Sequence, residues 1–170
     1  MQYHYDVVDT PLGKFFILDS SKGLHFLIKY SDSRVKIIKK KFLPIKNLLN
    51  SSLKSQLEKY LNRKQKEFSC KIGFLSGTDL QKQVWTQLRK LSYGKTISYS
   101  QLASKTSYPK AVRAVASAVG KNPIGIIIPC HRVIAKDGTL GGYAWGLKMK
   151  AKLLDIEVSG MADSTYRGGK

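Results

Sequence analysis

Acidic residues are scarce in this chain of 170 residues, which carries 11 Asp and Glu against 30 Lys and Arg. The formal charge of +19 is spread evenly, with +9 over residues 1–77 and +9 over residues 78–158, so it is not confined to a tail. So few carboxylates exclude a preference for cationic partners and predict a polyanion such as nucleic acid. Charge alone leaves two alternatives open: an anionic membrane surface, or a Lys-rich surface that serves solubility or heat tolerance.

Long apolar runs, cysteine and histidine are also in short supply. No run approaches the roughly 20 residues that span a bilayer, and the N-terminal MQYHYDVVDT lacks a signal-peptide core. We therefore expect a soluble, intracellular protein, cytoplasmic or associated with the nucleoid or nucleus, with no membrane partner. Cys70 and Cys130 are predicted to be free thiols. With His4, His25 and His131 they assemble no recognisable zinc spacing, so we expect no metal and no cofactor.

The chain has enough apolar residues, 42%, for a packed core. Its first thirty residues alternate in the manner of β-strands and predict an antiparallel sheet, interrupted by a turn at residues 11–13. Turn and capping residues at 76–79 precede a strongly helical stretch, and we place a domain boundary there. Other predicted elements are a helix or edge strand at 34–46, a helix at 48–61, a strand at 68–75, and helices at 79–91, 99–105, 109–120 and 147–157.

The predicted fold class is α/β (α+β). A small N-terminal domain, residues 1–77, would combine an antiparallel sheet with helices, and a mostly helical C-terminal domain would span residues 78–158. Residues 159–170 are predicted to form a disordered tail.

The helical patterns at 99–105 and 109–120, separated by a tight turn, predict a helix-turn-helix motif. Pro109 would lie in the first turn of the second helix and Gly120 would end it. Small side chains allow that helix to approach a partner closely, although an Ala-rich helix is more often simply buried.

The segment IIIPCHRV, residues 126–133, places a thiol, an imidazole and a guanidinium at the end of an apolar run. We interpret GIIIP as a buried extended segment that carries Cys130 into the interior, where an unassisted thiol is protonated and inert. His131 can act as its base or charge partner. Neighbouring residues of an extended chain point to opposite faces, so this pair can require a bridging water. The alternative is a buried structural cysteine.

PCHRVI, preceded by Asn122-Pro123 and followed by GGYAWG, resembles the active-site signature of the O6-alkylguanine-DNA alkyltransferases, which are direct-reversal DNA repair proteins. The resemblance continues through GTDLQKQVW, YGKTISYSQLA and PKAVRAVASAVGKNP, and covers about residues 77–158. It implies a methylated-DNA–protein-cysteine S-methyltransferase that acts on double-stranded DNA carrying O6-alkylguanine. The base would be flipped out of the duplex, and its alkyl (methyl) group would pass irreversibly to Cys130 in a single turnover that consumes the protein. A monomer is expected, with cooperative binding on DNA left open.

The resemblance also implies roles for individual residues. His131 would deprotonate Cys130 through a water, and Glu157 would orient His131, as in a catalytic triad. Tyr99 would protonate the leaving guanine. Asn122 would tie the segment that carries Cys130 to its surroundings.

The extruded base would lie against Val133, Tyr143, Ala144 and Lys150. Many members of the family carry serine at the position of Ala144, and Trp145 stands where a small residue is common. These two differences leave the range of accepted alkyl groups open.

Arg113 would enter the base stack and fill the vacancy left by the flipped base. The resemblance implies that the second helix of the motif addresses the minor groove, whereas most such helices read the major groove. We expect little sequence preference and a strong dependence on salt. The other residues predicted to face DNA are Ser100, Lys110, Ala111 and Ala114.

Each of these residues, taken singly, has an ordinary interpretation: Tyr99 and Tyr143 as core aromatics, Glu157 as a helix-surface charge, Arg113 as a phosphate contact and Asn122 as a turn residue. Two other functions also stand as alternatives. A non-catalytic alkyltransferase-like protein that binds lesions typically replaces the nucleophile, which the thiol at position 130 argues against. The second is a DNA-binding regulator that uses the helix-turn-helix. Its fused sensor form would carry a methyl-accepting zinc cysteine cluster, which residues 1–77 lack.

Overall fold

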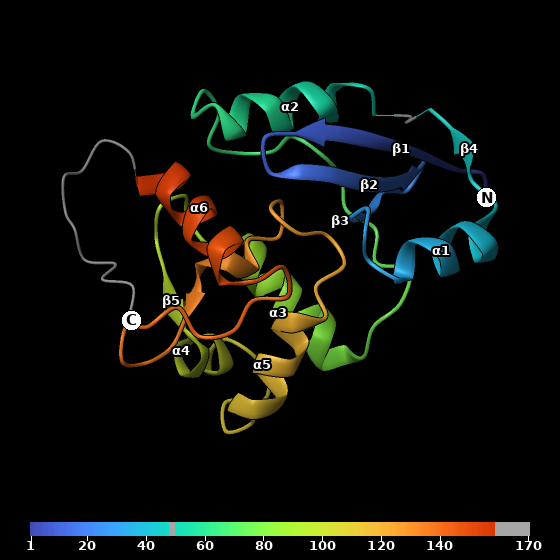
Figure 1. The fold of residues 1–170 in the computed structure, drawn as a ribbon. Helices are drawn as coiled ribbons and strands as arrows, with labels where there is room; N and C mark the ends of the chain where they lie inside the picture. The colour runs from blue at the N-terminus through green and yellow to red at the C-terminus, as the bar shows by residue number, and fades with distance from the viewer. Residues whose placement is uncertain (48–49, 159–170) are drawn as a thin grey trace. The chain divides into compact units, whose positions relative to one another are not determined.

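The computed structural model describes residues 1–47 and 50–158 and divides into two compact units (Figure 1). Of the described residues, the first unit contains those up to 75 together with 123–125, and the second contains 76–122 and 126–158. An antiparallel sheet belongs to the first unit and most of the helices to the second, which confirms the predicted fold class. The predicted tail at 159–170 lies outside the described residues.

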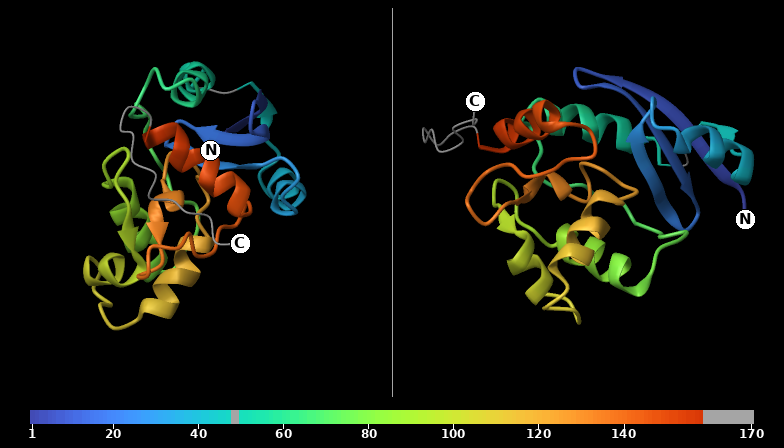
Figure 2. Two further views of the ribbon diagram at one scale, coloured as in Figure 1. Left: turned by 60° about the vertical axis from the view of Figure 1, so that its left-hand side comes forward. Right: turned by 60° about the horizontal axis from the view of Figure 1, so that its bottom comes forward.

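Three long strands form the sheet of the first unit, as the alternating pattern predicted. They are β1 (Tyr3–Thr10), β2 (Gly13–Ser20) and β3 (Gly23–Lys29), and they pair antiparallel in the order β3-β2-β1. Both views of Figure 2 show them twisting together as one ribbon, as L-residue strands do. Two-residue turns join the strands, which keeps the sheet contacts local in sequence.

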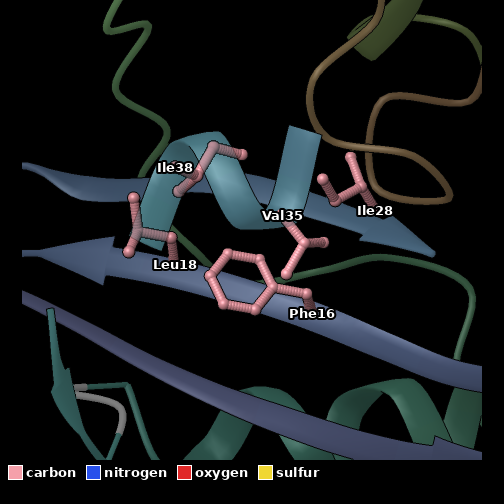
Figure 3. Packing of buried hydrophobic residues seen from close by; sticks show 5 residues of the cluster. All are labelled: Phe16, Leu18, Ile28, Val35 and Ile38. Atoms are coloured by element: carbon pink, nitrogen blue, oxygen red, sulfur yellow. The ribbon is translucent and has the colours of Figure 1, made fainter. Parts of the chain in front are cut away.

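The segment 34–46, for which the sequence allowed a helix or an edge strand, forms one of each. Helix α1 (Arg34–Phe42) is followed by β4 (Ile45–Lys46), an edge strand that runs parallel to β1. The apolar face of α1 packs on one face of the sheet, where alternate residues of β2 and β3 point (Figure 3). The buried cluster consists of Phe16, Leu18, Ile28, Val35 and Ile38.

Helix α2 (Ser52–Leu61) begins four residues later than predicted; residues 48–49 of that prediction lie outside the described residues. The predicted strand at 68–75 is wrong, because only Ile72 forms an isolated bridge, with Leu24. The physical reason is competition for the free edge of β3. Leu27, further along this edge, exchanges hydrogen bonds with Pro123 and Gly125 instead.

The second unit contains four α-helices among the described residues: α3 (Asp79–Arg89), α4 (Tyr99–Ser104), α5 (Val112–Gly120) and α6 (Leu147–Val158). Capping boxes at Thr78 and Ser98 satisfy the first amide groups of α3 and α4 and explain why these helices begin where they do. Helices α3, α4 and α5 pack together, and the indole N–H of Trp85 donates to the carbonyl of Ala118 at 2.9 Å. No helix among the described residues is long and apolar enough to cross a membrane.

Helix α5 starts at Val112, so the prediction that Pro109 lies in its first turn is wrong. Pro109 belongs to a turn that the Ala111 amide closes on the carbonyl of Tyr108, at 3.0 Å. The connection from α4 to α5 therefore spans residues 105–111 and is longer than the tight turn that was predicted. Gly120 is the last residue of α5, as expected for a helix that stops there.

Candidate active site

The segment before Cys130 is buried but not extended, which corrects the prediction for GIIIP. Residues 125–127 form turns, and Ile126 has φ of 67°, a left-handed conformation that is strained for a β-branched residue. Residues Cys130–Arg132 then form a single 3₁₀ turn, η1. With three residues per turn, their side chains point about 120° apart rather than to two opposite faces. The three side chains therefore leave the turn in different directions, although the imidazole and the guanidinium both reach Glu157.

Asn122 holds this turn from the preceding helix end. Its buried side-chain amide donates to the carbonyl of Ile128 at 2.8 Å and to Sγ of Cys130 at 3.1 Å. Both hydrogens of the Asn122 side-chain amide are thus donated to the segment that carries Cys130. Asn122 is not merely a turn residue, because its amide contacts the sulfur directly.

The environment of Cys130 keeps its sulfur protonated at rest. The residue is 7% exposed, and burial raises the pKa of its thiol. The hydrogen bond from Asn122, the hydroxyl of Tyr143 and the positive charge of Lys150 act in the opposite direction without overcoming burial. A thiol in this state needs a base before it can act as a nucleophile, but its thiolate has partners ready to receive the charge.

His131 is fully buried and has hydrogen-bonding and charged partners of its own. Its Nε2 lies 2.8 Å from Oε1 of Glu157 on α6, so Nε2 carries the hydrogen and Nδ1 is the proton-accepting nitrogen of the neutral ring. Burial lowers the pKa of His131, and the charges of Arg132 and Lys150 add to that effect, whereas Glu157 opposes it. The imidazole is therefore neutral at neutral pH. Glu157 is 5% exposed, so its interpretation as a helix-surface charge is wrong.

Arg132 is the residue of this site that the sequence analysis left without a role. It is buried, and its guanidinium grips the Glu157 carboxylate with Nε 2.8 Å from Oε2 and Nη2 2.8 Å from Oε1. Burial by itself raises the pKa of Glu157, but the hydrogen bonds and charges of His131 and Arg132 outweigh it and lower the pKa to about 2. The signal was present in PCHR, since an arginine in an apolar segment requires a buried carboxylate partner.

Lys150 is the second buried cation, on the same helix as Glu157. Its Nζ donates to the backbone carbonyls of Val133, at 2.5 Å, of Leu140, and of Gly142, at 3.2 Å. Lys150 thereby ties the loop after β6 (Val133–Ile134) to α6. Burial lowers its pKa to about 8, although the nearby Cys130 thiolate would raise it.

The two tyrosines predicted for the site are half-buried, so neither is an ordinary core aromatic. Tyr99 opens α4, and the two-stranded pairing of β5 (Ile97–Ser98) with β6 brings it beside the reactive segment. Burial, followed by the charge of Cys130, raises the pKa of Tyr99, so its phenol keeps its proton. Its ring lies against Gly141, where an added Cβ would be 3.4 Å from Cε2.

The loop after Gly141 carries the remaining predicted pocket residues. Tyr143 contacts the ring of Trp145 edge to face, with centroids 5.8 Å apart, and Ala144 between them is exposed. Val133 is fully buried at the start of β6. The Tyr143 hydroxyl lowers the pKa of the Cys130 thiol.

The predicted DNA-facing residues lie on the surface of the helix-turn-helix. Arg113 and Ala114 are exposed on the first turn of α5, Lys110 is exposed just before it, and Ser100 is exposed on α4. Ala111 is partly exposed. The opposite face of α5 is buried, so the Ala-rich helix serves both as core and as an open surface of small side chains.

The second unit thus combines a buried Cys-His-Glu arrangement with an exposed, basic helix-turn-helix. Such a combination is typical of a DNA-binding protein with an internal cysteine nucleophile. Two family models match nearly the whole chain: "6-O-methylguanine DNA methyltransferase, ribonuclease-like domain" over residues 3–74 and "6-O-methylguanine DNA methyltransferase, DNA binding domain" over residues 79–159. The chain belongs to the 6-O-methylguanine DNA methyltransferase family, as its resemblance indicated.

Individual relatives agree with the family models. A methylated-DNA–protein-cysteine methyltransferase of Methanosarcina barkeri is 39% identical over 154 residues, which cover 91% of this chain and 96% of the relative. The crystal structure of Mycobacterium tuberculosis O6-methylguanine methyltransferase superposes with a TM-score of 0.80 at 35% identity, covering 95% of this chain and 97% of that one. The crystal structure of M. tuberculosis OGT in complex with DNA has a TM-score of 0.81 at 34% identity, covering 91% and 92%.

Proposed function

We propose that this chain repairs O6-alkylguanine in double-stranded DNA by transferring the alkyl group to Cys130. The observation that carries the proposal is the reactive turn itself. Asn122 holds its sulfur, Lys150 supplies a nearby charge, and the next residue is an imidazole oriented by a buried carboxylate. Membership of the methyltransferase family and the likeness to a DNA-bound relative support DNA as the partner.

The chemistry follows from the protonation states of the free protein. The Cys130 proton passes through a water to Nδ1 of neutral His131, and Glu157 stabilises the imidazolium that forms. The thiolate attacks the alkyl carbon in line, so that the S–C bond forms as the bond between carbon and O6 breaks. The guanine anion takes a proton from Tyr99. Tyr99 regains one from solvent, to which the imidazolium of His131 releases the proton of the thiol. A thioether remains, and the protein is spent after one turnover.

Burial of the nucleophile dictates how the substrate reaches it. A sulfur that is 7% exposed cannot contact O6 of a guanine stacked in a duplex, so the base must rotate out of the helix. Arg113, exposed on the first turn of α5, would fill the vacancy, and the small residues of α5 would allow close contact with a minor groove. The extruded base would lie among Val133, Tyr143 and Ala144.

The test is incorporation of alkyl mass. Incubated with an oligonucleotide that carries O6-methylguanine, the protein should gain one methyl group on the peptide containing Cys130, with a stoichiometry of one per chain. Cys130→Ala should gain none while still binding duplex DNA. Methyl transfer that persists in Cys130→Ala, or its absence in the wild type, would overturn the proposal.

A further inference from the structure

Glu157 receives more hydrogen bonds than orienting His131 requires. One carboxylate oxygen, Oε1, is shared by His131 Nε2 and Arg132 Nη2, each at 2.8 Å. The other oxygen, Oε2, accepts from Arg132 Nε at 2.8 Å and from the Gly94 amide at 3.1 Å. A histidine alone would leave the carboxylate free to rotate about its last bond, whereas the bidentate guanidinium, together with the Gly94 amide, fixes its plane.

Arg132 is itself held in place. Its Nη1 donates to the carbonyl of Leu91 at 2.5 Å, and its guanidinium lies over the ring of Tyr93, 5.8 Å from the centroid. The Tyr93 hydroxyl donates to the carbonyl of Ile156 at 2.9 Å, which fixes that ring against α6. The chain between α3 and β5 therefore forms a rigid backing for the guanidinium.

The charges around His131 give Arg132 a second effect. Glu157 faces the imidazole with a negative charge, Arg132 and Lys150 contribute positive charges, and Cys130 is the neighbour that becomes negative during the reaction. The carboxylate at 2.8 Å raises the pKa of His131 against the burial that lowers it, and the charge of Arg132 acts in the same direction as burial. An imidazolium has no free lone pair and cannot take a proton from the thiol.

We propose that Arg132 is a positioning residue for the transfer reaction, one that orients the Glu157 carboxylate toward His131 and offsets its charge so that the resting imidazole stays neutral. This inference rests on the proposed function and deepens it. Arg132 does not touch the reacting atoms. It acts through Glu157, and in this respect its role differs from that of an arginine that only fills the core.

Two substitutions separate its geometry from its charge. Arg132→Gln removes the positive charge. Arg132→Lys keeps the charge but loses the bidentate hydrogen bonding of the guanidinium. Arg89→Gln, at an exposed arginine of α3, is the matched control. The pH titration of His131 is followed by NMR, which is practical because the chain has three histidines and a His131→Gln spectrum assigns the signal.

In Arg132→Gln the midpoint of the His131 titration should rise by about one pH unit or more, since a nearby charge typically shifts a pKa by roughly one to three units. The acid limb of the single-turnover rate, measured with a free O6-alkylguanine base, should move to higher pH by the same amount. Arg132→Lys should leave the midpoint in place and lower the rate at least tenfold at every pH. Arg89→Gln should match the wild type in both measurements.

A purely structural arginine gives a different pattern. Both variants would then lose thermal stability while the His131 midpoint and the rate profile stayed where they were, and that result overturns the proposal. If Arg132→Gln does not fold, Arg132→Lys is used by itself. A plateau transfer rate of Arg132→Lys equal to that of the wild type then overturns the proposal. The NMR titration needs no alkyl transfer, so failure of the proposed function would appear separately, as a wild type that gains no alkyl mass.

Discussion

The side-chain amide of Asn122 lies 3.1 Å from the sulfur of Cys130 and uses its second hydrogen on the carbonyl of Ile128, at 2.8 Å. One side chain therefore sets both the path of the backbone before the nucleophile and the polarity around the sulfur. The bond to sulfur gains strength as the thiol ionises, because a hydrogen bond to an ionised group is stronger than one between neutral groups. Asn122 consequently favours the reactive state more than the resting one.

Replacing Asn122 by alanine should slow alkyl transfer by about 10- to 100-fold. The basis is the loss of one hydrogen bond to a charged group, worth roughly 1.5–3 kcal/mol, at about 1.36 kcal/mol for each factor of ten in rate. Stability should fall by roughly 0.5–1.5 kcal/mol, because the buried carbonyl of Ile128 loses the Asn122 donor and keeps the Cys130 amide. Single-turnover kinetics and denaturant unfolding measure the two effects. Asn62→Ala, at an exposed position of the first unit, is the control, and an unchanged rate in Asn122→Ala would refute the role of the amide.

Arg113 and Lys110 should be distinguishable by kinetics, although both are exposed cations at the start of α5. Arg113→Ala should lower the maximal transfer rate from duplex DNA at least tenfold and leave the rate with a free O6-alkylguanine base unchanged, because only the duplex has a vacancy to fill. Lys110→Ala should weaken duplex binding, reduce the salt dependence of binding by about one phosphate contact, and leave the maximal rate intact. Equal losses on duplex and free base in Arg113→Ala would contradict its insertion into the base stack.

The buried ammonium of Lys150 predicts a specific pH dependence of stability. Its pKa is about 8 in the folded chain against an ordinary value of 10.5. Below pH 8 Lys150 is protonated in both the folded and the unfolded chain, so its contribution to the free energy of unfolding does not change with pH. Between about pH 8 and 10.5 Lys150 is protonated to a larger fraction in the unfolded chain than in the folded chain. The free energy of unfolding should therefore rise with pH in this window, relative to that of Lys150→Met.

Denaturant unfolding of the wild type and of Lys150→Met across about pH 7 to 10.5 measures this difference, since titrations common to both proteins cancel. Lys152→Met, exposed on the same helix, is the control and should follow the wild type. A difference between wild type and Lys150→Met that stays flat through this window would show that Lys150 titrates normally.

Much of the fold follows from local patterns. Alternating apolar residues and two-residue turns specify the three-stranded sheet, because every pairing involves neighbours in the chain. Capping residues at Thr78 and Ser98 mark helix starts, since the first amides of a helix need acceptors close by in sequence. Where the signal was ambiguous, as at 34–46, local pattern allowed two structures and the chain adopts both in succession.

The candidate site also has features that the sequence predicts and features that only the fold determines. The sequence by itself determined that Cys130 sits in an apolar segment with His131 and Arg132 beside it, and through its resemblance to a family it indicated which distant residues join them. Only the tertiary structure decided that residues 130–132 form a 3₁₀ turn, that the edge of β3 takes residues 123–125, and that Arg132 clamps a carboxylate 25 positions away. The physical reason is that burial and charge pairing depend on distances in space, which periodicity along a chain does not encode.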